Sequence, residues 1–213
     1  MSSRMRSSRG RSSNTPASFI APCRPTVASK PPKGPGWAHE LKHDGYRLQI
    51  HIRDGRVRLY TRTGADWSKR YPLIVKDARR IEGTAILDAE VVWLDSKGVS
   101  VFEALHSRDN DDQAMACVFD LLMVNGEDLR RKPYVGRKEM LQKVLRRTRH
   151  GIQYVAHIEG DGAEMFEAVC KVGLEGMVSK ELDSPYRSGR TKSWIKVKNP
   201  NAPAATRAED GTF

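Results

Sequence analysis

The chain has 213 residues, enough for one substantial domain or two small ones, and no apolar run approaches the ~18 residues that a membrane-spanning helix needs. A membrane-spanning class is therefore not expected. The net charge of +11 is typical of proteins that contact nucleic acid, but seven of those charges lie in residues 1–36, which contain no acidic residue. Residues 37–213 carry the remaining +4, so the body of the protein is only mildly basic.

The N-terminal region divides into two segments by composition. Residues 1–17 are a low-complexity Ser/Arg segment, which predicts a disordered basic tail. Such a tail attracts phosphate backbones through counterion release, although a solvated leader or an organelle transit peptide has the same composition. Residues 18–36 form a Pro/Gly-rich lead-in. We expect the ordered domain to occupy residues 37–200, with a C-terminal tail at 201–213.

The cysteines limit the chemistry and the compartment. Cys23, Cys117 and Cys170 are odd in number and lack metal-ligand spacing, so neither a disulfide framework nor a zinc site is expected. No apolar secretory signal precedes the domain. These features favour a reducing, cytoplasmic location.

Hydrophobic periodicity predicts strands and helices in alternation. Residues 46–53 alternate strictly, Asp54-Gly55 supplies a turn, and residues 57–61 alternate again, which predicts an antiparallel hairpin with one buried face. Further strands are expected at residues 85–94 and 115–124 and, shorter, near 152–157, 176–181 and 193–198. Helices are expected at residues 137–148, with a stripe of Met140, Leu141, Val144 and Leu145, and at 161–172, with Met165, Phe166, Val169 and Cys170, ending at Gly173. This mixture predicts an α+β fold with antiparallel sheets.

Lys42 is a candidate nucleophile within residues 40–47 (ELKHDGYR), directly before the hairpin. A free lysine titrates near 10.4 and is a poor nucleophile at neutral pH. Desolvation, or a cation such as Arg47 or a bound metal, favours the neutral amine, which can attack the α-phosphate of a nucleotide. A surface lysine before an ordinary turn has the same local pattern.

Carboxylates and lysines elsewhere suit a phosphate site. Asp88 and Glu90 share one face of an apolar strand, where a carboxylate must be paired, hydrogen-bonded or bound to metal. Glu175 precedes a predicted strand and could take Mg²⁺. Lys196 and Lys198 lie ~7 Å apart on one strand face, a spacing that suits a triphosphate. A salt-bridged strand end and a solvated strand face are the structural alternatives.

Six segments together resemble the motifs of the covalent nucleotidyltransferases, which comprise DNA ligases, RNA ligases and mRNA-capping enzymes. Residues 42–47 match the first motif, Lys-x-Asp-Gly-x-Arg. The others follow in the family's order, at residues 62–64 (RTG), 87–92 (LDAEVV), 118–122 (VFDLL), 174–180 (LEGMVSK) and 193–199 (SWIKVKN). Residues 31–37 and 186–190 resemble bacterial end-joining ligases, which favours a bacterial ATP-dependent DNA ligase.

The resemblance implies an adenylation domain of two antiparallel sheets with flanking helices and an ATP cleft between them. It implies that Lys42 carries AMP from ATP to the 5′-phosphate of nicked or broken duplex DNA, and that Glu90 and Glu175 hold Mg²⁺ or Mn²⁺. It also implies how the nucleotide is bound. Glu40 contacts the adenine amino group, Phe119 stacks on the base, and Glu90 contacts the ribose. Ribose or phosphate is contacted by Arg47 and Arg62, and phosphate by Lys180, Lys196 and Lys198.

Only 15 residues follow Lys198, so no OB-fold domain is expected within this sequence, and a separate OB-fold or end-joining protein is an expected partner. Three alternatives stay open. The first is an RNA ligase or capping-type enzyme with the same covalent step. The second is a non-catalytic DNA-binding or partner protein on a ligase scaffold. The third is a metal-dependent nuclease that uses Asp88, Glu90 and Glu175, which leaves Lys42 unexplained.

Overall fold

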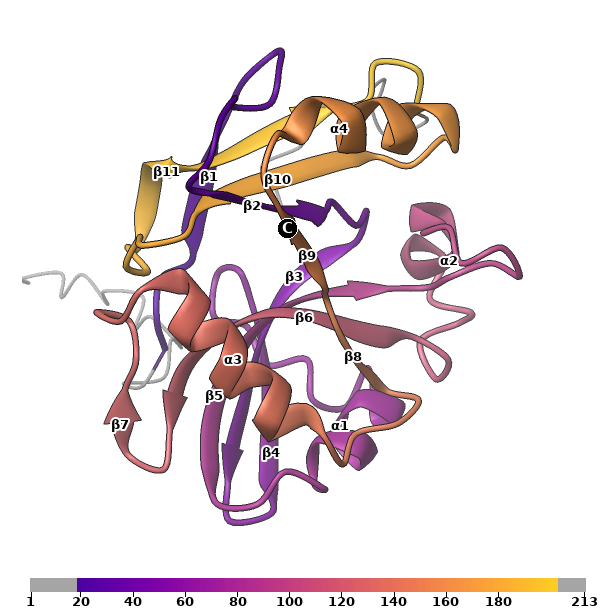
Figure 1. Cartoon of the computed structure of the whole chain (residues 1–213). Coiled ribbons are helices and arrows are strands. Elements are labelled where there is room, and N and C mark those ends of the chain that lie inside the picture. The colour runs from indigo at the N-terminus through magenta and orange to yellow at the C-terminus, as the bar shows by residue number, and fades with distance from the viewer. Residues whose placement is uncertain (1–18, 203–213) are drawn as a thin grey trace, which may run out of the picture.

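The computed structural model describes residues 19–202, which form two β-sheets with helices packed on their outer sides (Figure 1). The predicted basic tail, residues 1–17, and the residues after 202 lie outside the described part. None of the helices within residues 19–202 is long and apolar enough to cross a membrane.

Sheet A has five strands. In spatial order they are β1 (Cys23–Val27), β11 (Gly189–Lys198), β10 (Gly176–Glu181), β2 (Trp37–Leu41) and β9 (His157–Glu159). β1 pairs parallel with β11, and the other neighbours are antiparallel. β1 corrects the expectation that order begins near Trp37. The lead-in conceals this strand because Pro25 interrupts its apolar pattern, and the pairing register shifts between Pro25 and Thr26.

Sheet B has six strands. The path β4 (Arg56–Thr61), β3 (Tyr46–Arg53), β5 (Thr84–Val92), β6 (Met115–Val124) and β7 (Glu127–Asp128) is antiparallel, and β8 (Ile152–Tyr154) adds parallel to β6. The predicted hairpin is confirmed as β3 and β4. Asp54 and Gly55 join them with φ of 47° and 78°, the left-handed pair that a two-residue type I′ turn requires.

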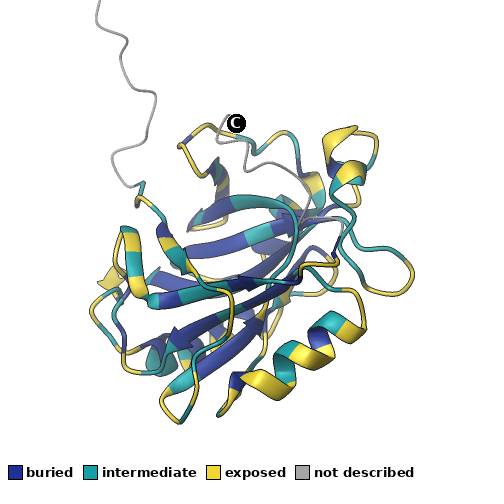
Figure 2. Ribbon diagram, turned by 90° about the horizontal axis from the view of Figure 1, so that it is seen from above, coloured by how far each residue is buried: buried dark blue, intermediate teal, exposed yellow. Residues whose placement is uncertain are grey.

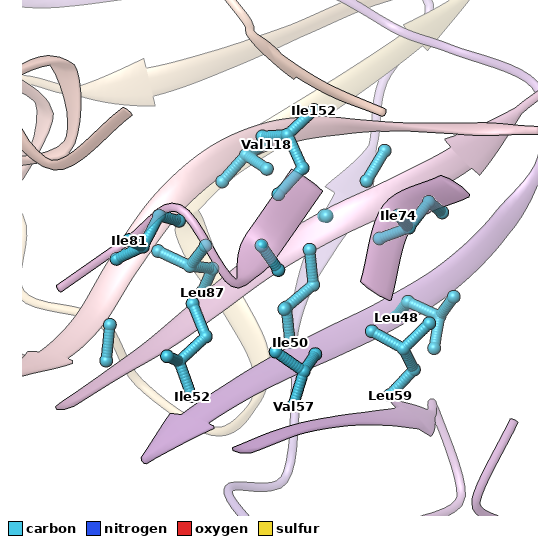
Figure 3. Close-up of a cluster of buried hydrophobic side chains, with 14 of the residues drawn as sticks. Leu48, Ile50, Ile52, Val57, Leu59, Ile74, Ile81, Leu87, Val118 and Ile152 are labelled. Carbon is cyan, nitrogen blue, oxygen red and sulfur yellow. The ribbon is translucent and has the colours of Figure 1, made fainter. Parts of the chain in front are cut away.

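The largest apolar core lies on the outer face of sheet B. Leu48, Ile50 and Leu59 are fully buried there (Figure 3). Two helices cover them, α1 (Pro72–Ala78), which begins at a proline, and α3 (Tyr134–Leu145). Truncating one such isoleucine or leucine to alanine costs about 2–5 kcal/mol, so this core holds sheet B rigid beneath the site.

The remaining helices are α2 (Phe102–His106) and α4 (Gly162–Lys171). Asp161 caps the start of α4 by accepting a hydrogen bond from the backbone N–H of Ala163. Gly173, at φ 76°, ends it as predicted, and the N–H of Leu174 bonds the carbonyl of Val169. Of the predicted α4 stripe only Val169 is buried, and α1 and α2 were not predicted.

The inner faces of the two sheets meet through a second apolar cluster. Ile20, Cys23, Tyr186 and Trp194 from sheet A and its flanking segments pack on Ile86 and Leu122 of sheet B. Figure 2 shows the strands of both sheets largely buried, with the exposed residues on loops and on the outer sides of the helices. Polar residues on the two inner faces are therefore brought together.

Candidate active site

Lys42 lies directly after β2, where the chain leaves sheet A for sheet B. Its backbone N–H donates to the carbonyl of Gly176 at 3.0 Å, and its ammonium group contacts a carboxylate oxygen of Glu175. Gly45 allows this turn to lie against β5, since a Cβ there would come within 1.8 Å of the carbonyl oxygen of Val91. Tight packing of the turn thus places Lys42 between the sheets.

Two carboxylates surround the Lys42 ammonium group. Burial raises the pKa of Glu90 to about 7, with Lys42 and Arg47 acting in the opposite direction. Burial also raises the pKa of Glu175, and the nearby Lys42 lowers it. Glu175 Oε2 is buried and accepts no hydrogen bond from the described residues. An open carboxylate oxygen close to a second carboxylate is a donor set that fits Mg²⁺ or Mn²⁺.

Arg47 and Asp88 form a bidentate ion pair across β3 and β5. The Nε–Oδ1 and Nη2–Oδ2 distances are 2.6 and 2.7 Å, and the hydroxyl of Tyr186 donates to Oδ2 at 2.5 Å. Asp88 is fully buried, so these partners satisfy a charge that would otherwise be costly. Asp88 therefore positions Arg47, and the nuclease alternative loses one of its three metal ligands.

Glu40 of β2 contacts one hydroxyl and two ammonium groups on the inner face of sheet A. Its Oε1 accepts hydrogen bonds from Tyr134 at 2.6 Å and Lys138 at 2.8 Å, and Lys180 Nζ lies 2.5 Å from Oε2. Burial alone would raise the pKa of this carboxyl, but the two ammonium groups outweigh it and lower the pKa to about 2. Glu40 is thus an ionised acceptor in an almost dry environment.

Phe119 of β6 faces these groups from sheet B. The Arg47 guanidinium lies 4.5 Å from its ring centroid, and Lys180 Nζ lies 4.6 Å from it. Trp194 meets the ring edge-on at a centroid distance of 6.2 Å, and Lys180 Nζ lies 4.0 Å from the Trp194 ring. The structure therefore groups Phe119 and Lys180 with Glu40.

The other predicted cations lie farther along the site. Lys196 and Lys198 of β11 pair with Val178 and Gly176 of β10, on the face that also carries Lys180. Lys198 is near enough to Glu175 to lower its pKa. Arg62 is exposed in the turn after β4, and no hydrogen bond or ion pair within residues 19–202 joins it to the cluster.

Sequence reasoning missed three residues that hold the site, namely Tyr134, Lys138 and Tyr186. Lys138 is fully buried and lies three and seven residues before the buried Leu141 and Leu145 on the inner stripe of α3. The position of a lysine on an apolar helical stripe was the sequence signal that could have identified Lys138. Tyr186 lies in residues 186–190, which were noted for their resemblance to bacterial end-joining ligases, but no role was assigned to this tyrosine.

The sequence pattern of one family, described as the ATP dependent DNA ligase domain, matches residues 24–198. The chain belongs to this family. The match covers every motif from Lys42 to Lys198 and begins within β1, which agrees with the structure rather than with the expected start near Trp37. The ligase-domain membership confirms the predicted adenylation-domain fold.

Curated relatives of this ligase domain are similar over most of its length. The multifunctional non-homologous end joining protein LigD of Pseudomonas aeruginosa is 38% identical over 188 residues, which cover 84% of this chain and 22% of that protein. The SPbeta prophage-derived DNA ligase-like protein LigB of Bacillus subtilis is 30% identical over 186 residues, which cover 85% of this chain and 68% of that protein. The chain thus spans about a fifth of the length of LigD.

Solved structures show the same architecture. The ligase domain of LigD from M. tuberculosis superposes with a TM-score of 0.76 at 33% identity, covering 84% of this chain and 59% of that one. A mycobacterial DNA ligase D complexed with ATP gives a TM-score of 0.74 at 34% identity, covering 84% of this chain and 60% of that one. ATP is therefore the nucleotide expected between the two sheets.

Proposed function

We propose that this ligase domain transfers AMP from ATP to Lys42 and then to the 5′-phosphate of a broken duplex DNA strand, which is afterwards sealed. The observation that carries the proposal is the contact of the Lys42 ammonium group with Glu175, beside Glu90 and between two sheets of the ligase fold. A lysine with this role must lose its proton next to a triphosphate, and Glu175 and Glu90 would supply the ligands for a divalent ion whose positive charge favours the neutral amine.

We assign the base end of the nucleotide to Glu40, Phe119 and Lys180. The ionised Glu40 accepts a hydrogen bond from the adenine amino group, and Phe119 offers its ring for stacking. The expected phosphate contact of Lys180 fits the structure poorly, because its ammonium group is buried against Glu40 and Trp194. We place Lys180 beneath the base instead.

We assign the phosphate end to the remaining cations and carboxylates. Arg47 and Arg62 contact ribose or phosphate, Lys196 and Lys198 neutralise the phosphates, and Glu90 contacts the ribose. Glu175 and Glu90 would hold Mg²⁺ or Mn²⁺, which supplies charge neutralisation for the leaving pyrophosphate when bound.

The first step forms the bond between Lys42 Nζ and the α-phosphorus and breaks the bond from that phosphorus to the bridging oxygen, whose electron pair leaves with pyrophosphate. Lys42 must first give up a proton. Glu175 stabilises the charged form of Lys42 in the structure, and a divalent ion held by Glu175 and Glu90 would supply the positive charge that favours the neutral amine. In the second step a DNA 5′-phosphate oxygen displaces Lys42 from phosphorus, and in the third a 3′-hydroxyl displaces AMP.

The test is labelling of the protein with α-labelled ATP and Mg²⁺, followed by a chase with nicked duplex DNA. Wild type should retain acid-labile label on a denaturing gel and transfer it to the DNA 5′ end. Lys42→Ala should retain none, whereas Lys143→Ala, an exposed lysine on α3, should label normally. Equal label in Lys42→Ala would overturn the proposal.

The same assay separates the alternatives. Stronger labelling from GTP would indicate a capping-type enzyme, and transfer to nicked RNA but not to nicked DNA would indicate an RNA ligase. A separate OB-fold or end-joining protein stays an expected partner. The cytoplasmic location stays a prediction, and action on DNA would place the protein at the bacterial nucleoid.

A further inference from the structure

The indole N–H of Trp194 is a buried donor that the described part of the fold leaves without a partner. Trp194 lies on β11 with 1% of its surface exposed, and its Nε1 makes no hydrogen bond to any group within residues 19–202. An indole nitrogen can only donate, so an acceptor has to come to it. Proteins rarely leave such a donor unpaired, because its lost hydration is costly, which makes a ligand a natural source of the acceptor.

Trp194 lies at the base end of the side chains that we assign to the nucleotide. It pairs with Lys180 across β10 and β11, so these two side chains share the inner face of sheet A. Lys196 and Lys198 follow on the same face of β11 at steps of two residues, each about 7 Å along the strand. Because these two lysines are assigned to the phosphates, Trp194 precedes them by one step in the direction of the base.

The indole and the Glu40 carboxylate flank one ammonium group. Lys180 Nζ lies 4.0 Å from the centroid of the Trp194 ring and 2.5 Å from Glu40 Oε2. We assign Glu40 to the amino group of adenine, and in adenine the ring nitrogens N1 and N7 lie on either side of that amino group. Both nitrogens accept hydrogen bonds in the plane of the base. A donor close to Glu40 is therefore close to one of them.

Phe119 relates the indole to the plane of the base. The Phe119 and Trp194 rings meet edge-on, with centroids 6.2 Å apart and an interplanar angle of 80°. A base that stacks parallel to Phe119 would thus stand nearly perpendicular to the indole. The N–H can then point along the line where the two planes cross, which is also a direction open to a lone pair of the base. Tyr186 packs edge-on against Trp194 at 5.7 Å and limits rotation of the indole.

We propose that the Trp194 indole N–H donates a hydrogen bond to N1 or N7 of the bound adenine and is a specificity-determining contact for ATP. This rests on the proposed function for the presence of adenine at the site. The competing explanation is a weak contact of the N–H with the ring face of Phe119 or Tyr186, which needs no ligand. The two explanations differ in whether the indole responds to the chemistry of the base.

The test compares lysine labelling by ATP, 1-deaza-ATP and 7-deaza-ATP, each labelled at the α-phosphate, in wild type, Trp194→Phe and Trp93→Phe. Each analogue replaces one ring nitrogen by a C–H group and so removes one acceptor. Trp93 is the control because it is a partly buried tryptophan that packs against the outer core of sheet B. The ratio of kcat/KM for ATP to that for each analogue is taken within each protein, so that a smaller folded fraction of Trp194→Phe cancels.

Wild type should use one of the two analogues about tenfold less well than ATP, whereas Trp194→Phe should use that analogue and ATP about equally well. The ratio for the other analogue should be the same in these two proteins, and Trp93→Phe should match wild type throughout. Equal ratios in wild type and Trp194→Phe for both analogues would overturn the proposal. So would an equal change of the ratio in Trp93→Phe.

A second measurement does not depend on turnover. The indole N–H signal of Trp194, identified by its absence from Trp194→Phe, is followed by ¹H–¹⁵N NMR of the wild-type chain during titration with each nucleotide without Mg²⁺. The signal should move downfield with ATP and with one analogue, but not with the analogue that labels poorly. Identical positions with all three nucleotides would overturn the contact. If wild type takes no label from any nucleotide, the proposed function fails, while this signal still decides whether Trp194 contacts the base.

Discussion

Lys138 and Glu40 form an ion pair that is almost completely removed from water. The Nζ–Oε1 distance is 2.8 Å, and the side chains are 1% and 3% exposed. With Tyr134 on the same oxygen, Oε1 has two donors, whereas Oε2 has a single ion-pair partner, Lys180, within residues 19–202. The acceptor position left on Oε2 is the one we assign to the adenine amino group, so Lys138 is a positioning residue for base selection.

Replacing Lys138 by methionine should weaken the preference for ATP over GTP. Guanine presents an oxygen where adenine presents an amino group, and a carboxylate held rigidly in its ionised form rejects that oxygen. We expect the ATP:GTP ratio of kcat/KM for lysine labelling to fall about tenfold, chiefly through KM for ATP. Lys143→Met on the exposed side of α3 is the control. A folded Lys138→Met protein with the wild-type ratio would remove this role.

The Arg47–Asp88 pair predicts a large effect on stability. Among the described residues, Arg47→Met leaves the fully buried Asp88 with the Tyr186 hydroxyl as its single side-chain donor, which should cost about 3–5 kcal/mol of unfolding free energy. Tyr186→Phe should cost about 1.5–3 kcal/mol, because the lost hydrogen bond is made to a charged carboxylate. Replacing both partners, as in Arg47→Met/Asp88→Leu, should recover most of the loss. Urea unfolding measures all three, and a loss below about 1 kcal/mol for Arg47→Met would show that the pair is unimportant.

Gly45 should tolerate no side chain. An alanine Cβ would lie 1.8 Å from the carbonyl oxygen of Val91, which belongs to backbone and cannot rotate away. Gly45→Ala should therefore lower stability by about 1–3 kcal/mol and abolish labelling, because the turn that carries Lys42 must move. Gly136→Ala in α3 faces open space and should be neutral or stabilising by up to about 1 kcal/mol. Wild-type labelling by Gly45→Ala would contradict the packing argument.

His51 predicts part of the acid sensitivity of the fold. Its folded pKa is about 4, below its ordinary value of 6.5, owing to burial and to Arg53. Between these values the unfolded chain binds a proton that the folded protein does not, so stability falls as the pH drops from about 6.5 to 4. His51→Gln should lose less stability over that interval than wild type, while the exposed His150→Gln should behave as wild type. Parallel curves for all three proteins would exclude His51 as a source.

Local patterning predicted the β3–β4 hairpin, β6, β10 and the end of α4 because each has a strict period or a glycine signal. It failed for β1, since a parallel edge strand that contains a proline has no alternating pattern, and its pairing to β11 spans more than 160 residues. It also failed for α1 and α2, which have 7 and 5 residues and are too short for a clear helical period.

The site residues were likewise predicted only in part from the sequence. The motif residues were identifiable because their order along the chain resembles one family. The residues that hold the motif residues in place could not be identified, because each contact joins distant parts of the chain. Lys138 and Glu40 are 98 residues apart, and so are Tyr186 and Asp88. Such pairs depend on tertiary packing, which neither periodicity nor spacing describes. The grouping of Lys180 with Glu40 instead of the phosphate lysines likewise required the structure.

Peptide mass spectrometry of the protein after incubation with ATP and Mg²⁺ decides whether Lys42 carries the nucleotide. We expect the mass of AMP on the peptide that contains Lys42, the loss of this adduct after addition of pyrophosphate or nicked duplex DNA, and no adduct in Lys42→Ala. AMP on Lys138, Lys180, Lys196 or Lys198, or an adduct that persists in Lys42→Ala, would contradict it.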